Sequence, residues 1–153
     1  MRASGLGGGT VARSAVRGVI ASMAMTGMRR VTTGLGLLEQ APPEAIADHG
    51  SGVSKLFDRV PPERRDEAVE LAHWAFGGVA GALFAAVVPE GTRTRWAGPA
   101  YGLAIWGLFE TVLVPLLGLE HAKERTVMTR VVAAADHALY GAIVGNTPWP
   151  HRP

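Results

Sequence analysis

Two long stretches of the chain are almost free of charge. In residues 71–89 the only ionisable side chain is His73. In residues 96–119 the only charged side chain is Glu110. A helix on the surface of a soluble protein shows a polar side chain every three or four residues, and neither stretch does. About 20 apolar residues in a helix cross the ~30 Å hydrocarbon layer of a bilayer, so both stretches are predicted to be transmembrane helices.

A third apolar stretch, residues 15–38, is interrupted by Arg29 and Arg30. Charged side chains are costly inside the hydrocarbon layer unless they reach its edge or meet a partner. Two interpretations stay open. Either the span is short and ends at the arginines, or the arginines snorkel or pair within a longer span.

The last apolar stretch, residues 130–148, contains Asp136 and His137. Each of these costs a few kcal/mol in a membrane if it has no partner, so the helix either crosses the bilayer or lies on it. We predict that it crosses. The result is an all-α, polytopic integral membrane protein with a domain over residues 15–149 and about four spans, at residues 15–38, 70–89, 96–119 and 130–148.

The main water-exposed part is predicted to be the polar segment 39–69. Within it, residues 53–60 place their apolar side chains at the i, i+3, i+4, i+7 spacing of a one-sided helix. This short amphipathic helix either covers the bundle and the lipid headgroups or docks a partner. Residues 1–14 begin with a Gly-rich run and are expected to be a flexible tail.

The pattern His-x-x-aromatic-Gly-x-x-x-Gly occurs twice, starting at His73 and at His137. Side chains four residues apart share one face of a helix, so each copy forms a strip of small residues. Such strips let helix backbones approach closely in a membrane. The repeat favours a duplicated two-helix unit in a glycine-packed bundle. The glycines expected at helix contacts are Gly77, Gly81, Gly98, Gly102, Gly141 and Gly145.

Several ionisable side chains fall inside or beside the predicted spans, namely Arg29, Arg30, His73, Glu110, Asp136 and His137. A carboxylate within a membrane is either protonated or paired, so Glu110 is expected to pair with Arg29 or Arg30. The histidines allow three interpretations. Each makes one interhelical hydrogen bond, or they join Glu110 and Asp136 in a path for protons or ions, or they ligate haem b as a pair.

Composition excludes other classes of protein. The chain holds 15 Lys and Arg against 13 Asp and Glu, and the basic residues are not clustered as a nucleic-acid-binding face requires. No nucleic-acid partner is expected. With no cysteine, thiolate zinc sites, disulfides and cysteine nucleophiles are excluded. No phosphate-binding loop and no hydrolase or metalloprotease motif occurs, so we predict no catalytic residue and no metal site.

Short motifs resemble the YagU-like family of small bacterial inner-membrane proteins of unknown function. They are Pro42-Pro43-x-x-Ile46, the Ala-His-x-x-aromatic-Gly sequence that begins at Ala72, and the His-x-x-Tyr-Gly sequence that begins at His137. The likeness extends over roughly residues 15–147. It implies a polytopic helical protein of the bacterial cytoplasmic membrane and brings no established catalytic residues.

The leading functional prediction is a non-enzymatic structural or accessory membrane protein. Its partners are the lipid bilayer and either a second copy or a larger membrane complex, reached through the small-x3-small helix faces. With four spans both termini lie on one side of the membrane, which we predict to be the cytoplasmic side. The alternative is a small transporter or proton- or ion-conducting protein that uses Glu110, Asp136 and His137. The third is a haem-binding redox protein.

Overall fold

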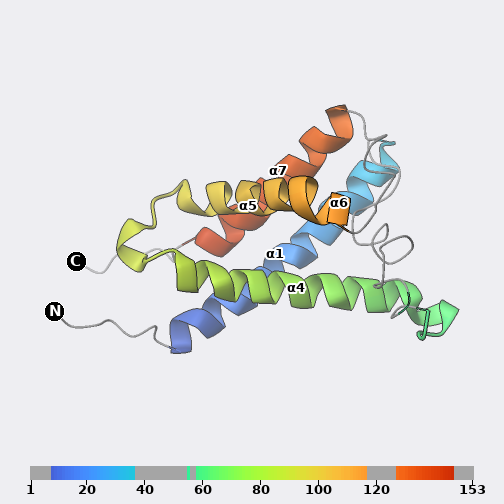
Figure 1. Cartoon of the computed structure of the whole chain (residues 1–153), viewed down its shortest axis with the longest axis horizontal. Helices are drawn as coiled ribbons and strands as arrows, with labels where there is room; N and C mark the ends of the chain where they lie inside the picture. Colours follow the sequence, from blue (N-terminus) through green and yellow to red (C-terminus); the bar gives the residue numbers. More distant parts are fainter. Residues whose placement is uncertain (1–7, 37–54, 56–57, 117–126, 147–153) are drawn as a thin grey trace.

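The computed structural model describes residues 8–36, 55, 58–116 and 127–146. These residues are helical, with turns and short connections but no β-strand among them, which confirms the all-α prediction (Figure 1). In chain order the elements are α1 (Gly8–Gly34), the short 3₁₀ turn η1 (Pro62–Arg64), α4 (Arg65–Val87), the 3₁₀ turn η2 (Glu90–Thr92), α5 (Ala97–Leu108), the π-helical segment η3 (Phe109–Leu113), α6 (Val114–Leu116) and α7 (Val127–Gly145).

Three helical segments are long and apolar enough to cross a membrane. They are Pro62–Val87, Ala97–Leu116 and Val127–Gly145, and they overlap the predicted spans 70–89, 96–119 and 130–148. The prediction of a membrane protein is confirmed at this level. Helix α1 is 27 residues long but is not among the three, because four arginines and many glycine, serine and threonine residues interrupt its apolar positions.

The boundaries of two predicted segments differ from the structure. Helix α1 begins at Gly8, so residues 8–14, expected in the flexible tail, are helical. Near its start, Thr10 Oγ1 donates a hydrogen bond to Glu90 Oε1 at 3.2 Å, which ties this end to the α4–α5 connection. Most of the polar segment 39–69, including half of the expected amphipathic helix at residues 53–60, lies outside the described residues.

Helix α4 has a defined start and end. Pro62 opens the η1 turn, and the acidic Asp66 and Glu67 lie in the first turn of α4 near its positive end. The helix ends one residue before Val88, which is extended and precedes a proline. The Arg93 side chain donates to the carbonyl oxygens of Val88 at 3.1 Å and Ala85 at 3.3 Å, which satisfies carbonyls left free at a helix end.

The four long helices form two antiparallel pairs, α1 with α4 and α5 with α7, and α1 also packs against α7. Figure 1 shows the start of α1, the end of α4, the start of α5 and the end of α7 at one end of the molecule. Two tyrosine hydroxyls connect the pairs. Tyr140 of α7 donates to the Gly77 carbonyl at 2.6 Å, and Tyr101 of α5 donates to the Ala80 carbonyl at 2.7 Å.

Glycine lies where α1 meets α4. A methyl group added at Gly18 would overlap the carbonyl oxygen of Gly77 and come within 3.1 Å of the Cα of Gly81. One added at Gly81 would overlap the carbonyl oxygen of Ser14. The two backbones therefore touch directly, and no larger side chain fits between them.

The α5–α7 pair repeats these contacts. A methyl group at Gly98 would overlap the carbonyl oxygen of Gly141 and lie 2.9 Å from the Cα of Gly145. One at Gly102 would overlap the carbonyl oxygen of His137. Gly98, Gly141 and Gly145 thus correspond in their contacts to the three glycines where α1 meets α4.

The burial of side chains differs from that in a soluble protein, where large apolar side chains are mostly inside and polar side chains mostly outside. The apolar core is small and consists of Ala21, Met25, Ala80, Phe84, Tyr140 and Val144. Buried polar side chains accompany it, namely Ser14, Ser22, Thr26, Arg29, Thr32 and Asp136. Many large apolar side chains are exposed instead, among them Ile20, Val31, Phe76, Val79, Leu83, Leu108 and Val131. Such an outer surface suits lipid as the solvent.

The glycine contacts give a direct prediction. Gly141→Ala adds a methyl group against the Gly98 backbone, and overpacking of this kind costs about 1–3 kcal/mol. Gly27→Ala is the matched control, because nothing lies within 4 Å of the added carbon and alanine favours a helix by up to about 1 kcal/mol. Unfolding of both variants in mixed detergent micelles, followed by circular dichroism, measures the difference. Equal stabilities would contradict the packing described here.

Candidate functional site

The Arg29 side chain of α1 is buried at the contact with α4. Only 7% of the residue is exposed. Its Nη2 atom donates to Thr26 Oγ1 at 3.0 Å, lies 3.4 Å from Glu70 Oε2 and contacts His73 Nδ1 at 3.3 Å. A permanently charged guanidinium is tolerated away from water only with partners of this kind.

The Thr26 hydroxyl is the centre of this cluster. It donates to Glu70 Oε2 at 2.7 Å and accepts from the Trp74 indole nitrogen at 3.2 Å as well as from Arg29. Each lone pair and hydrogen of the hydroxyl is thereby used. The contact fixes the register of α1 against α4 at the end opposite the Gly81 contact.

Helix α7 adds two ionisable side chains on the other side of Arg29. Asp136 is 7% exposed, and its Oδ1 atom has no hydrogen-bond partner among the described residues. The Nε atom of Arg29 is likewise buried without a partner there. Both Asp136 and His137 interact electrostatically with Arg29, so the cluster extends across α1, α4 and α7.

Glu110 lies in η3, where the helix makes an i+5 hydrogen bond from the Val114 nitrogen to the Phe109 carbonyl. Single π-helical turns of this type are frequent at functional sites. Glu110 is half-buried and interacts electrostatically with His137. The fourth helix thus brings its one carboxylate toward the same group of side chains.

The hydrogen bonds assign the ring protons of the two histidines. Arg29 can only donate, so Nδ1 of a neutral His73 accepts and its proton is on Nε2. The Nδ1 atom of His137 lies 2.8 Å from the Ala133 carbonyl oxygen, which can only accept, so that nitrogen carries the proton. The two rings are therefore opposite tautomers.

Five of the six ionisable residues predicted from the sequence belong to this cluster, and the sixth, Arg30, does not. His73, Asp136 and His137 each interact electrostatically with Arg29, and His137 also interacts with His73 and Glu110. Arg30 is exposed on the outer face of α1. The six predicted glycines lie in the helix contacts described above.

The ion-pair partner of Arg29 is Glu70, the first residue of the predicted span 70–89, which was not among the candidate partners of Arg29. A signal for it existed, because Glu70 precedes His73 by three residues and shares its helix face. Thr26 was missed as well. Its signal is the i+4 series Ser14, Gly18, Ser22 and Thr26, which forms a buried stripe of small residues on α1.

The cluster combines one fixed cation, Arg29, with three carboxyl groups and two imidazoles. Among the described residues no group of three or more His, Asp or Glu side chains is arranged to hold a metal ion. Haem ligation by both histidines would require His73 to give up its contact with Arg29, because the free Nε2 atom of that tautomer offers a hydrogen and not a lone pair.

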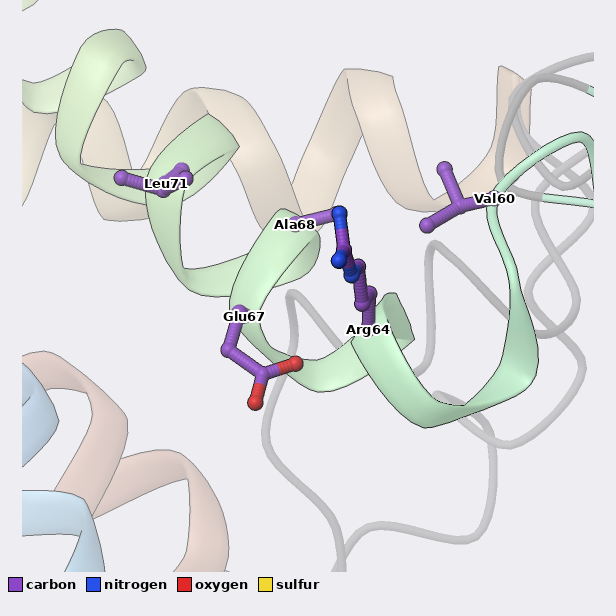
Figure 2. Close-up of a pocket in the computed structure, with 5 residues that line it drawn as sticks. All are labelled: Val60, Arg64, Glu67, Ala68 and Leu71. Atoms are coloured by element: carbon purple, nitrogen blue, oxygen red, sulfur yellow. The ribbon is translucent and has the colours of Figure 1, made fainter.

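A shallow pocket of about 390 Å³ lies at the start of α4. Figure 2 shows its lining, Val60, Arg64, Glu67, Ala68 and Leu71. None of the cluster residues lines it. The pocket is therefore separate from the candidate site.

The ion pair predicts a large difference between two adjacent arginines. Arg29→Gln leaves the partly buried Glu70 without its cation, and because breaking a fully buried pair costs about 3–5 kcal/mol, a loss of about 2 kcal/mol or more is expected. Arg30→Gln, at an exposed position, is expected to change stability by about 0.5 kcal/mol or less. Unfolding in mixed detergent micelles measures the stability change of both variants. In a double-mutant cycle with Glu70→Gln, the combined loss should be smaller than the sum, and strict additivity would contradict the pairing.

No family model matches the chain, and neither a curated protein nor a solved structure is similar to it. The resemblance to the YagU-like family therefore stays a prediction from short motifs.

Proposed function

We propose that the chain is an integral membrane protein with four membrane-crossing helices that carries protons across the bilayer through the polar cluster around Arg29. The observation that carries the proposal is the meeting of ionisable groups from all four long helices at one place. Ionisable residues inside a membrane are costly, and they mark pathways for ions and protons by default.

The surface of α1 supports its place in the bilayer despite its low hydropathy. Its small polar residues Ser14, Ser22 and Thr26 and one of its arginines, Arg29, are buried against the neighbouring helices, whereas Arg13 and Arg30 are exposed. Its outward face carries large apolar side chains, which are Val16, Ile20, Met23, Met28 and Val31. Lipid would meet that apolar face, while the neighbouring helices satisfy the polar one.

Protons are favoured over other cations by the chemistry of the groups. Imidazole groups accept and release protons near neutral pH, and carboxyl groups do so where burial disfavours their charged form. Arg29 carries a single positive charge beside the carboxyl groups of Glu70 and Asp136. When one of these carboxyl groups binds a proton, its negative charge is removed. A metal ion would need several ligand atoms to do the same. Metal ions would need a set of ligands that the described residues do not present.

A structural or accessory role is the competing proposal. The glycine strips that suggested association with a partner are occupied by contacts within the chain. A partner in the membrane would therefore have to use the exposed apolar faces, such as the one with Phe76, Val79 and Leu83. Proton flux separates the two proposals, because an accessory protein would conduct none by itself.

Flux in proteoliposomes tests the proposal. With a potassium gradient and valinomycin, vesicles that hold the purified protein and a pH-sensitive dye should change internal pH faster than empty vesicles. Asp136→Asn keeps the shape of the side chain but cannot exchange a proton, and it should slow the flux about tenfold or more. Asp66→Asn is the matched control at an exposed position and should leave the flux unchanged.

Folded wild-type protein that gives no more flux than empty vesicles would overturn the proposed function. Circular dichroism of the reconstituted vesicles shows that the protein is helical in the same samples.

A further inference from the structure

The Nη2 atom of Arg29 has more acceptors around it than it has hydrogens. It carries two N–H bonds. Three acceptors lie within hydrogen-bond distance, which are Thr26 Oγ1 at 3.0 Å, His73 Nδ1 at 3.3 Å and Glu70 Oε2 at 3.4 Å. Thr26 and Glu70 are therefore enough for both hydrogens, and the contact with His73 can break without leaving a hydrogen of Nη2 unpaired.

The Nδ1 lone pair of His73 can hold either Arg29 or a proton, but not both. Arg29 can only donate, so it occupies this lone pair when the ring is neutral. The same lone pair is where the neutral ring takes up a second proton, since Nε2 already carries one. An imidazolium has a hydrogen on both nitrogens and cannot accept a hydrogen bond. The guanidinium and the proton therefore exclude each other at Nδ1.

Glu70 is placed to pair with the ring once it is protonated. Its Oε2 atom lies 4.0 Å from His73 Nδ1, and a charge-assisted N–H···O hydrogen bond needs about 2.8 Å. A carboxylate offers about four lone pairs, which is enough for Thr26, Arg29 and the protonated ring together. A small movement of the side chains thus exchanges the hydrogen bond between Arg29 and His73 for an ion pair between His73 and Glu70.

The exposure of the three side chains indicates the end of the bundle from which the proton arrives. The side chains are 24% exposed at Glu70, 13% at His73 and 9% at Arg29. Glu70 also lies one turn nearer than His73 to the start of the apolar segment Pro62–Val87. A proton from that end meets Glu70 and His73 before it meets the more deeply buried guanidinium.

Other ionisable groups set the charge balance of the exchange. From α7, His137 acts electrostatically on the ring and Asp136 on Arg29. Glu110 of η3 acts on His137. When Glu70 and Asp136 are both ionised, their two negative charges are matched by the guanidinium and the protonated ring. Binding of the proton thus makes this group of four side chains neutral, which favours it in a membrane.

We propose that His73 is the residue that loads the proton and that Arg29 competes with the proton for its Nδ1 atom, an inference that rests on the proposed proton conduction. A hydronium ion gives its proton to the Nδ1 lone pair and leaves as water. The hydrogen bond from Arg29 breaks, and the ring becomes an imidazolium paired with Glu70. When the proton leaves Nδ1 again, Arg29 returns to the lone pair. Arg29 is thus a positioning residue, which restores the empty state after each proton.

Nuclear magnetic resonance of the full chain in lipid bilayers tests the exchange in the wild type. With ¹⁵N-labelled arginine and histidine and ¹³C-labelled glutamate, the neutral ring of His73 should carry its proton on Nε2 and should contact Arg29 through Nδ1. On acidification Nδ1 should gain a proton and lose this contact in one step, while Glu70 is still ionised. Spectra of His73→Asn and Glu70→Gln assign the signals. Protonation of Glu70 first, or a ring that stays neutral as long as the protein is folded, would overturn the proposal.

His73→Asn tests the loading step in the proteoliposome assay. The amide oxygen of asparagine lies close to the place of Nδ1 and can accept the hydrogen bond from Arg29, but it does not bind a proton near neutral pH. Proton flux should fall about tenfold or more, while the unfolding transition in detergent stays close to that of the wild type. Glu63→Gln, at an exposed position of η1, is the control and should keep the flux.

Thr26→Val tests the competition, because it removes one acceptor of Arg29 and keeps the shape of the side chain. Both Nη2 hydrogens then go to Glu70 and His73, and the proton must displace a stronger hydrogen bond. Half-maximal flux should require a pH that is lower by about 0.5 units or more. Loosened packing would act in the opposite direction, because a ring freed from Arg29 binds a proton more readily. Thr33→Val, at an exposed position of α1, should leave the pH profile unchanged. An unchanged or raised pH for Thr26→Val would contradict the competition.

The outcomes separate this inference from the proposed function. If the wild type conducts and His73→Asn keeps its flux, His73 does not load the proton and proton conduction stands. If the wild type does not conduct, the proposed function fails, and the magnetic resonance titration still decides whether Arg29 and the proton exclude each other at Nδ1.

Discussion

The burial of one guanidinium organises the interior of this protein. Arg29 cannot lose its charge, so α1 can pack against its neighbours only where carboxylate, hydroxyl and imidazole groups meet it. Thr26 and Glu70 satisfy it from one side, and Asp136 acts on it from another. The ionisable groups gather where they do because each is less costly beside this cation than alone in an apolar environment.

Close contact of backbones provides the frame around that charge. At the Gly18 and Gly98 positions the helices touch without intervening side chains, and dispersion forces between backbones then replace the hydrophobic effect, which is weak between helices in lipid. Tyr101 and Tyr140 add hydrogen bonds between the pairs. Near the glycines the backbones touch, and Phe84 and Tyr101 pack beside them, whereas Arg29 and its partners lie toward the other end of α1.

The sequence predicts part of this arrangement. Absence of charge was enough to find the apolar parts of α4 and α5, whereas α7 carries Arg130, Asp136 and His137 among its apolar residues. It was not enough for α1, whose buried face is made of small polar residues such as Ser22 and lowers its mean hydropathy. The partner of Arg29 depends on which helices meet. Glu70 is about three helical turns from Gly81 at the far end of the glycine strip, and its spacing from His73 indicates its helix face but not the cation that it meets. The tautomers of His73 and His137 follow only from their hydrogen-bond partners.

The π-helical segment at Phe109–Leu113 has a consequence for symmetry. Gly18 and Gly98 make the same contacts and are 80 positions apart (98 − 18). Glu110 follows Gly98 by 12 residues and Arg29 follows Gly18 by 11, and the wider turn of η3 takes up one residue. Two helix pairs with the same glycine contacts then carry different charges, Arg29 with Glu70 in one and Glu110 with Asp136 in the other.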